Sequence, residues 1–530
     1  MIKSLGDIVE QHAETFPDKA AIIQEGASWT YRDLRDLSRR AAQGLLHAGI
    51  EQQNRVAFLD RSSREYFPFL FGAGLVNAVT VAVNWRLAAP EMEYILNNAG
   101  ARVLLIGEEF LGHLAQMDLA STTTVIVLGD PGDTGYPTWD EWVNSFEPEF
   151  PNIDVAPEDI CYQLYTSGTT GLPKGVEISN RNLFGMLPDS GMLPNSGVEW
   201  SFDSDSVNLV SMPLFHIAGS GWGVCAFFFG GTNVILRDVD PAEILRLIDS
   251  ERITNILLVP SVLQFVQAVP GAENTDFSSV RSVVYGASPI SEEVLVGAMN
   301  LMGCDFVQTY GLTETTGGIT TLPASDHDPG GRNAHLLRSA GKAWGDVEIR
   351  IVDEETMTDL SDGEVGEIWV KSRQNMEGYW ANPEATALVF PEGKNADGIG
   401  WFRTGDAGYL LDGYLYIHDR VKDMIISGGE NIYPAEVENA LMSHPDLDDA
   451  AVIGVPSEKW GETVKAIVVI REGTDPTESD IINYCRSRIA HYKCPTSVDR
   501  IDVLPRNPSG KILKTELRVP YWGNKNRAVN

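Results

Sequence analysis

Positive charge is scarce in this sequence of 530 residues, where 40 lysines and arginines stand against 74 aspartates and glutamates. The net charge of −34 argues against a protein whose main partner is a nucleic acid or an anionic membrane, because both require a positive surface. The charge is also uneven. Residues 421–530 carry −2 and the final fifty carry +7, which leaves −32 on residues 1–420. We expect an acidic body, a basic tail and no nucleic-acid partner.

Cysteine is rare as well, with five residues at wide spacing and no Cys-x-x-Cys pair. This pattern indicates neither a zinc site nor a disulfide framework, and it favours a reducing compartment. The first residues include acidic side chains and no apolar run, unlike a secretory signal. The longest apolar stretch, Tyr66–Val83, is interrupted by proline and glycine, so we interpret it as a buried helix followed by a strand. We predict a cytoplasmic protein without an integral membrane segment.

The length of the chain predicts more than one domain. Up to about Val347, helical patterns alternate with short β-rich runs such as Val280–Val284, as expected for layered α/β folds. From there to Arg420, short strands and turns dominate. A new α/β unit then begins, with a predicted helix at Glu478–Ala490. We therefore predict an α/β protein with a β-rich subdomain before its C-terminal unit.

The most informative segment is Tyr165-Thr-Ser-Gly-Thr-Thr-Gly-Leu-Pro-Lys-Gly175. Glycines free the backbone to turn its N–H groups inward, hydroxyls add donors, and a lysine supplies a cation, which together favour a polyphosphate site. It is not a Walker A loop, because Gly175 rather than serine or threonine follows Lys174, and strands are predicted on both sides. ATP or a similar ligand is predicted to bind Thr166, Ser167, Gly168, Thr169, Thr170, Gly171 and Lys174.

A second segment, Gln308–Thr315, combines a tyrosine with a hydroxyl and a carboxylate. Tyr310 offers an aromatic face for a base, and Thr313 and Glu314 suit a phosphate-bound Mg²⁺. An ordinary turn is the alternative. Upstream, small residues after a predicted strand at Tyr285–Pro289 would allow a flat ligand to approach the backbone closely.

A third segment ends in Asp406, which could accept hydrogen bonds from both hydroxyls of a ribose, with help from Arg420. The alternatives are a turn cap for Asp406 and a surface ion pair for Arg420. Lys511 follows a glycine in a predicted loop. Taken alone, such a lysine is more often solvated than catalytic.

Together these segments resemble the adenylate-forming superfamily of acyl-CoA synthetases, nonribosomal adenylation domains and beetle luciferases. The resemblance extends from Leu5 to about Arg518, with the motifs in order. It implies a multi-domain α/β fold. Residues 1–420 would form a large N-terminal AMP-binding domain of two stacked α/β subdomains plus a β-barrel-like subdomain. Residues 421–530 would form a small mobile C-terminal α+β domain, with a hinge near 420–424.

The resemblance also assigns roles around the nucleotide. Glu314 and Thr169 would bind Mg²⁺, and Thr313 would lie near the α-phosphate. Lys511 would bridge the carboxylate and the α-phosphate, where a cation lowers the cost of bringing two anions together. The catalytic residues would be Lys511, His216, Glu314 and Lys174. The adenine and ribose would contact Gly286, Ala287, Ser288, Gln308, Thr309, Tyr310, Gly311, Asp406 and Arg420.

For the remaining substrates, the resemblance places the hinge at Lys422 and the CoA tunnel at Gly428 and Gly429, where a side chain would block the thiol. His216 would gate the acyl pocket, although a buried structural histidine is the alternative. The small residues bordering that pocket would be Gly219, Gly221, Gly311, Gly317 and Gly318.

The resulting hypothesis is an ATP-dependent acyl-CoA synthetase that activates a carboxylic, fatty acid as acyl-AMP and transfers it to CoA, releasing AMP and pyrophosphate. An aromatic or branched acid, and a carrier-protein phosphopantetheine as acceptor, stay open. So do a noncatalytic binding protein, the acyl chain length and a homodimeric state. A luciferase or cinnamate ligase is disfavoured, because Ile426 stands where those relatives carry a lysine.

Overall fold

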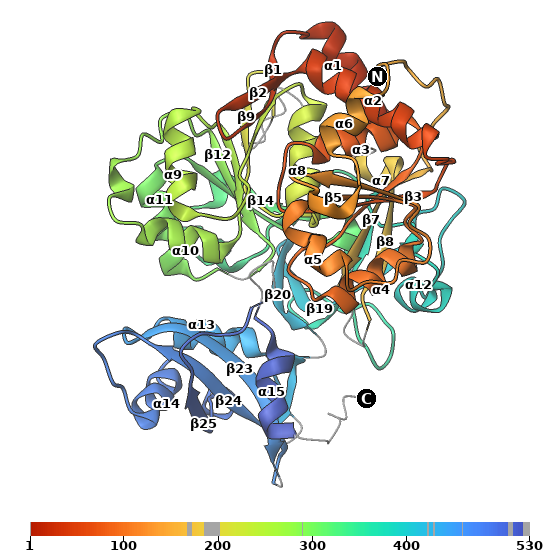
Figure 1. The fold of residues 1–530 in the computed structure, drawn as a ribbon. Helices are drawn as coiled ribbons and strands as arrows, with labels where there is room; N and C mark the ends of the chain where they lie inside the picture. The colour runs from red at the N-terminus through yellow and green to blue at the C-terminus, as the bar shows by residue number, and fades with distance from the viewer. Residues whose placement is uncertain are drawn as a thin grey trace.

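The computed structural model divides the chain into two α/β units, a β-rich unit and a separate small domain (Figure 1). It describes residues 2–166, 172–184, 202–288, 290–420, 423–427, 430–457, 459–506 and 512–522. Within these ranges, no helix combines the length and the apolar character needed to cross a membrane.

The first α/β unit is built on a sheet that has nine strands within the described residues. Its central strands pair in parallel, and antiparallel strands close both edges. In spatial order the strands are β15 (Lys342–Ala343), β14 (Gly317–Leu322), β13 (Asp305–Leu312), β12 (Ser282–Gly286), β11 (Asn255–Leu258), β9 (Val207–Val210), β10 (Thr232–Ile235), β1 (Ala20–Gln24) and β2 (Ala27–Thr30).

The second α/β unit has a seven-stranded sheet in the described part of the chain. In spatial order its strands are β18 (Gly378–Tyr379), β8 (Lys174–Ser179), β7 (Ile160–Thr166), β4 (Val79–Ala82), β3 (Arg55–Leu59), β5 (Val103–Gly107) and β6 (Thr124–Leu128). The helices of the two units are α1 (Leu5–Thr15), α2 (Tyr31–His47), α3 (Tyr66–Leu75), α4 (Ala89–Ala99), α5 (Leu111–Leu114), α6 (Trp139–Asn144), α7 (Asn180–Phe184), α8 (Ile217–Phe228), α9 (Pro241–Ser250), α10 (Pro260–Ala268) and α11 (Glu292–Met302).

The β-rich unit and the small domain follow in sequence. The β-rich unit contains the antiparallel strands β16 (Glu348–Val352), β17 (Gly366–Lys371), β19 (Trp401–Leu411) and β20 (Tyr414–Arg420). Helix α12 (Pro383–Val389) comes before β19 in the chain. The small domain contains β22 (Glu430–Ile432), β21 (Ile425–Ser427), β24 (Gly461–Ile470), β23 (Leu447–Ser457) and β25 (Ser497–Arg500), with α13 (Pro434–Met442), α14 (Glu478–Arg486) and α15 (Lys514–Trp522). In Figure 1 this domain, in blue, lies below the larger units and turns α13 toward them.

Helix α8 connects the two α/β units. It contacts β9 and β10 of the nine-stranded sheet, and its Phe227 ring lies 5.0 Å from that of Phe67 on α3. A buried polar contact fixes this helix, because the Asn233 amide N–H donates to the Gly223 carbonyl of α8 at 3.0 Å, while its amide oxygen accepts from the Asn208 side chain on the next strand at 2.7 Å. Buried polar groups that bond in this way define one register and disfavour others. Helix α8 is therefore held firmly between the two units.

The predicted layered α/β fold, with a β-rich part before the small domain, is confirmed. The segment Tyr66–Val83 is indeed a buried helix followed by a strand. Two predicted boundaries were wrong. The strand at Val280–Val284 begins only at Ser282, because the Val280 N–H still closes a turn onto Phe277. The helix at Glu478–Ala490 ends at Arg486, where the Ser487 hydroxyl donates to the Tyr484 carbonyl and caps the last turn.

Candidate functional site

Three sheets meet at the predicted nucleotide site, and the first contribution is the β7–β8 hairpin. Its register places Thr166 opposite Lys174, so both residues lie at the end of the hairpin. The predicted phosphate residues between them, from Ser167 to Gly171, lie outside the described residues. The two strands predicted on either side of this loop are confirmed as an antiparallel pair.

Glu314 comes from the nine-stranded sheet, in the short turn between β13 and β14. The Thr166 hydroxyl donates to Oε1 of Glu314 at 3.3 Å, and the main-chain oxygen of Glu314 accepts from the Met376 N–H at 2.8 Å. The chain then reverses through Thr316 and Gly317, whose φ angles are +54° and +103°. The structure therefore brings the predicted magnesium carboxylate to the end of the predicted phosphate hairpin.

Tyr379 joins Thr166, Lys174 and Glu314 at this point, and the sequence motifs did not reveal it. Its phenol donates to Oε1 of Glu314 at 3.0 Å, and its ring centroid lies 5.0 Å from the Lys174 ammonium. Burial and the neighbouring Glu314 carboxylate raise the pKa of the Tyr379 phenol above its usual value. The only sequence signal was a Gly-Tyr-Trp run more than 200 residues after Lys174, which has no local pattern of its own.

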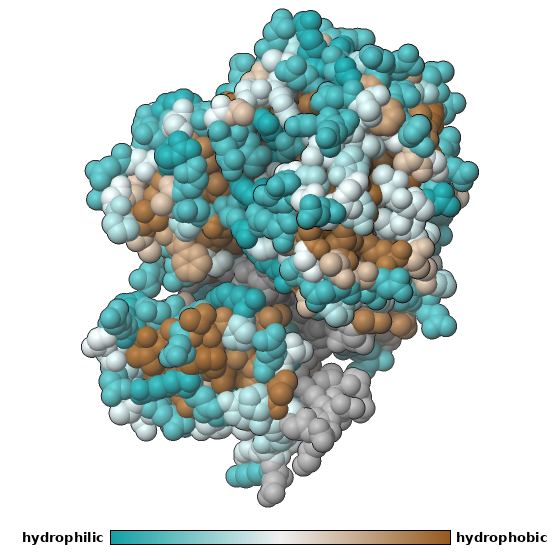
Figure 2. Space-filling model, in the orientation of Figure 1, coloured by the Kyte–Doolittle hydropathy of each residue, from teal (hydrophilic) through white to brown (hydrophobic). Residues whose placement is uncertain are grey.

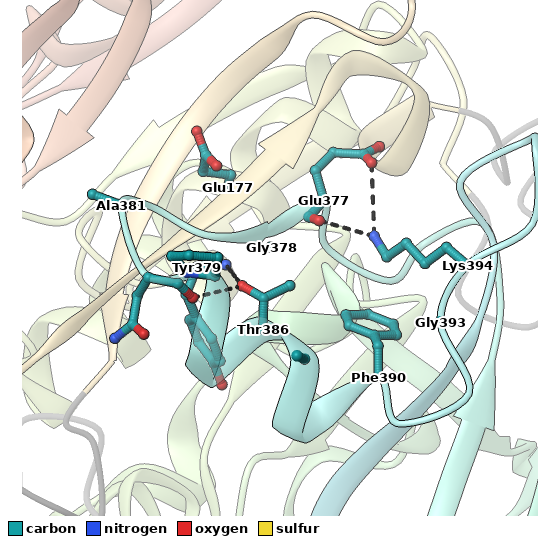
Figure 3. Close-up of a pocket in the computed structure, with 12 residues that line it drawn as sticks. Glu177, Glu377, Gly378, Tyr379, Ala381, Thr386, Phe390, Gly393 and Lys394 are labelled. Atoms are coloured by element: carbon teal, nitrogen blue, oxygen red, sulfur yellow. Dashed lines mark hydrogen bonds and ion pairs between the residues drawn. The ribbon is translucent and has the colours of Figure 1, made fainter.

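Tyr379 also lines a cavity of about 510 Å³ beside β8, β18 and α12 (Figure 3). In its wall, the Lys394 ammonium donates to the main-chain oxygens of Met376 and Glu377 at 2.6 and 3.0 Å. The Tyr379 N–H donates to the Thr386 hydroxyl at 2.9 Å. These polar groups are thus bonded to the chain itself, and they hold the segment that carries Tyr379 against β8.

The predicted adenine residues lie next to one another in the C-terminal parts of the paired strands β12 and β13. Register pairs Gly286 with Thr309, so the two predicted segments lie side by side. A β-carbon at Gly286 would lie 2.1 Å from the Thr309 carbonyl oxygen, which explains the glycine by close approach of two main chains. Ala287 has a φ of +66°, and Oε1 of Gln308 is buried without a partner among the described residues. A donor on a bound base would satisfy this acceptor.

Asp406 belongs to the β-rich unit and contacts Tyr310, one of the predicted adenine residues. The Tyr310 hydroxyl donates to its Oδ2 at 2.7 Å, and register places Arg420 directly across from it on β20. The turn before Asp406 is fixed by the buried Glu367, whose Oε1 accepts from the Gly405 N–H at 3.1 Å. The contact between Tyr310 and Asp406 therefore joins the predicted base and ribose residues, which come from two different sheets.

His216 caps the N-terminus of α8, and its Nε2 is buried without a partner among the described residues. Burial, together with the nearby positive charge of Arg86, lowers the pKa of the imidazole to about 4. The ring is therefore neutral at pH 7. Helix α8 contacts β14, which carries Gly317 and Gly318, so these predicted acyl-pocket elements are neighbours.

The glycines of this region have different physical explanations. A β-carbon at Gly219 would lie 2.2 Å from the Pro213 carbonyl oxygen, and one at Gly318 would lie 2.1 Å from the Thr309 hydroxyl. At Gly221 it would meet the Ile217 side chain at 2.8 Å, whereas at Gly317 there is open space. Close packing thus accounts for three of these four glycines, and their predicted place beside an acyl group stays a prediction. Gly311 packs in the same way against the Gly317 carbonyl oxygen.

Four further predicted residues, Lys422, Gly428, Gly429 and Lys511, lie outside the described residues. Their roles as hinge, CoA tunnel and catalytic cation stay predictions.

Two stacked α/β units with a β-rich unit and a separate small domain after them form the architecture of the adenylate-forming enzymes. The chain belongs to the AMP-binding enzyme family, because the model of that family matches residues 9–380. The model of the AMP-binding enzyme C-terminal domain matches residues 436–511. The predicted domain border at 420–424 lies between the two matches and stays a prediction.

Individual relatives cover nearly the whole chain. A fatty acid–[acyl-carrier-protein] ligase of Streptomyces coeruleorubidus is 38% identical over 100% of this chain and 98% of its own length. A feruloyl-CoA synthase of an Amycolatopsis species is 36% identical over 97% of this chain and 99% of its own length. The crystal structure of an anthranilate CoA ligase in complex with anthranoyl-AMP covers 98% of this chain and 97% of its own, at 26% identity and a TM-score of 0.88.

Proposed function

We propose that the protein is an acid–thiol ligase that uses ATP to convert a carboxylic acid, most simply a fatty acid, into an acyl adenylate and then into an acyl-CoA. In the first step, a carboxylate oxygen attacks the α-phosphorus of ATP and pyrophosphate leaves. In the second step, the thiol sulfur of CoA attacks the acyl carbon, and AMP leaves with the electrons of the broken bond.

The observation that carries this proposal is the meeting of three sheets at one point. Thr166 and Lys174 come from the seven-stranded sheet, Glu314 and Tyr310 from the nine-stranded sheet, and Asp406 from the β-rich unit. Hydrogen bonds of Glu314 and Asp406 connect the three. A nucleotide would thus find a cation near its phosphates, an aromatic ring near its base and a carboxylate near its ribose.

Mg²⁺ is part of the proposal, and the residues present fit it. This ion is commonly held by one or two carboxylates together with substrate phosphates, and here Glu314 is the carboxylate beside the phosphate hairpin. Thr169, the second predicted metal residue, lies outside the described residues. When bound, the ion would neutralise the phosphate oxygens from which pyrophosphate leaves. The residues of the chain would orient the nucleotide and exclude water.

The direct test uses purified protein with ATP, Mg²⁺, CoA and a panel of fatty, branched and aromatic acids. We expect an acyl-CoA to be detected by mass spectrometry with at least one class of acid. Pyrophosphate exchange into ATP that depends on the acid would report the first step alone, which a noncatalytic binding protein cannot perform. Absence of both products across the panel would refute the proposal.

A second test addresses Lys511. We expect Lys511→Ala to lower the rate of adenylate formation by at least ~10²-fold, the scale of one electrostatic contact to a transition state. Thioester formation from supplied acyl-AMP should persist, because the proposed role of this lysine is confined to the first step. Equal losses in both half-reactions would contradict that role.

A carrier-protein phosphopantetheine is the second candidate acceptor, and the Streptomyces relative that acts on an acyl-carrier protein favours it. Adenylate formation without turnover on free CoA, followed by loading of a phosphopantetheinylated carrier protein, would identify this acceptor. The aromatic acids in the panel test the third candidate, which the feruloyl-CoA synthase favours.

We also propose a cytoplasmic location. All five cysteines are free thiols, a state that a reducing compartment favours. Fractionation of the source cells with an antibody against the protein would test the location, and sedimentation of the purified protein would decide between a monomer and a homodimer.

A further inference from the structure

Tyr379 contacts both charged side chains of the proposed phosphate site. Its strand β18 pairs with β8, and register places Tyr379 opposite Val176, two residues beyond Lys174. The side chain crosses from the seven-stranded sheet to Glu314 of the nine-stranded sheet, with 3.0 Å between the phenol oxygen and Oε1. One side chain thus touches the lysine and the carboxylate that a magnesium–nucleotide complex would use.

The two hydrogen bonds of Glu314 fall on the same oxygen. Oε1 accepts from the hydroxyls of Thr166 and Tyr379, at 3.3 and 3.0 Å. Oε2 accepts no hydrogen bond from the described residues. Two donors on one oxygen fix the plane of a carboxylate. Oε2 is then the oxygen that would be left to bind a cation.

Lys174 is held without being neutralised. Its ammonium lies against the Tyr379 ring, and no carboxylate of the described residues lies within ion-pair distance of it. A cation over an aromatic face is stabilised by the ring quadrupole, yet it keeps its full charge. The lysine is therefore placed near Glu314 with its charge available to an anion.

The position of Tyr379 is itself well determined. The residue is 9% exposed, and its N–H donates to the Thr386 hydroxyl in the middle of α12 (Figure 3). The next residue, Trp380, donates its main-chain N–H to the Gly175 carbonyl oxygen at 2.8 Å. Tyr379 is thus fixed to β8, and its hydrogen bond to Glu314 can hold that carboxylate in place.

We propose that Tyr379 is a positioning residue for the magnesium–nucleotide complex. Its hydroxyl orients Glu314 toward the cation, and its ring places Lys174 for the phosphates. This inference rests on the proposed function, because it requires that ATP binds at the β7–β8 hairpin.

The test measures binding without turnover. Calorimetry with Tyr379→Phe, which retains the ring and removes only the hydroxyl, is carried out with ATP in Mg²⁺ and with ATP in excess EDTA. A lost hydrogen bond to a charged group corresponds to roughly a 10-fold change in affinity. We expect the Kd for ATP in Mg²⁺ to rise by about this factor, and the Kd in EDTA to stay within about twofold. Tyr379→Leu, which also removes the ring, should weaken binding in both buffers.

Two further variants separate positioning from a general loss of structure. Tyr414→Phe removes a similar phenol–carboxylate bond, to Asp326 at 2.8 Å, at the far end of β20, and it should bind ATP like the parent protein. In a Glu314→Gln background, Tyr379→Phe should cause little further loss in Mg²⁺, because the carboxylate on which it acts is gone.

The outcomes distinguish a failure of the proposed function from a failure of the role proposed for Tyr379. If the parent protein binds ATP in neither buffer, the proposed function fails and this inference fails with it. If the parent protein binds ATP in Mg²⁺ but folded Tyr379→Phe binds equally well, only the role of Tyr379 is refuted. An equal loss with and without Mg²⁺, or full additivity with Glu314→Gln, would also refute it.

Discussion

The charge of His216 determines what its burial contributes to stability. Burial first, and Arg86 second, lower the pKa of the imidazole from 6.5 to about 4. In the unfolded chain the ring binds a proton near pH 6.5, whereas the folded protein resists this proton until about pH 4. The contribution to stability is therefore complete above pH 6.5, and it is lost progressively as the pH falls from 6.5 to 4.

We expect His216→Leu to remove this part of the acid sensitivity. Between pH 7 and pH 5, the free energy of unfolding should fall by about 2 kcal/mol more in the parent protein than in the variant. Urea unfolding at the two pH values measures the difference. His335→Leu, which replaces an exposed histidine in the same way, is measured in parallel as the control. Identical pH dependence in His216→Leu and the parent would contradict the burial of this ring.

At the scale of elements, the N-terminus of α8 depends on a residue without a side chain. A β-carbon at Gly219 would lie 2.2 Å from the Pro213 oxygen and 2.4 Å from the Met212 oxygen, and both are main-chain atoms that cannot rotate away. The first turn of α8 is thus packed against the segment before it. Because α8 also carries His216 at its cap, a shift of this turn would move the proposed acyl gate.

We expect Gly219→Ala to destabilise the protein by about 1–3 kcal/mol, the usual cost of overpacking. Gly112→Ala is the matched control, since Gly112 also lies in a helix and a β-carbon there would meet no atom within 4 Å. In a helix, alanine is favoured over glycine by about 1 kcal/mol, so this control should be neutral or slightly more stable. Urea unfolding of both variants tests the prediction. A neutral Gly219→Ala would show that the turn can relax.

The elements that sequence analysis predicted best are those with a local pattern. The β7–β8 hairpin was recognisable because short runs typical of β-strands flank a segment of glycines and hydroxyls. Thr166, Lys174, Glu314 and Asp406 were singled out by composition within short segments, and the structure brings them to one junction. Their binding roles stay predictions, because the contacts of the chain with itself do not include the ligand.

Tyr379 and Glu367 could not be predicted in this way. Tyr379 acts on Glu314 through the pairing of β18 with β8, and Glu367 acts on Gly405 through the pairing of β17 with β19. Both effects depend on which strands become neighbours, and one sequence does not determine that locally. At Gly219 the sequence suggested a role that the packing of the chain explains in another way. A glycine near a predicted pocket suggested space for a ligand, yet close packing of the main chain explains it.

For the whole molecule, the net charge of −34 has consequences beyond the site. The large units carry −32 of it, and Figure 2 shows a surface that is mostly hydrophilic, with an apolar area on the visible face of the small domain. Like charges on a compact body repel one another, and this repulsion decreases when the chain expands. Part of the folding free energy is therefore opposed by the charge, and salt should relieve it.

We expect Tm to rise by several degrees when NaCl is raised from about 10 mM to about 300 mM, because the screening length falls from about 30 Å to under 10 Å. Thermal unfolding followed by circular dichroism measures the shift. A variant that combines Glu25→Gln, Glu149→Gln and Glu355→Gln, all at exposed positions, should be more stable than the parent at low salt and less sensitive to added salt. A Tm that is independent of salt in both proteins would show that self-repulsion is negligible.

The junction of three sheets also affects how the large domain holds together. One group of buried side chains spans both α/β sheets and includes Tyr162 of β7 and Val307 of β13, whereas Ile368 of the β-rich unit belongs to another group. A ligand that touches all three sheets stabilises their arrangement in proportion to its concentration over its Kd. In that case the nucleotide stabilises the large domain as well as reacting in it. The arrangement of the three sheets is then least stable each time the product leaves the site.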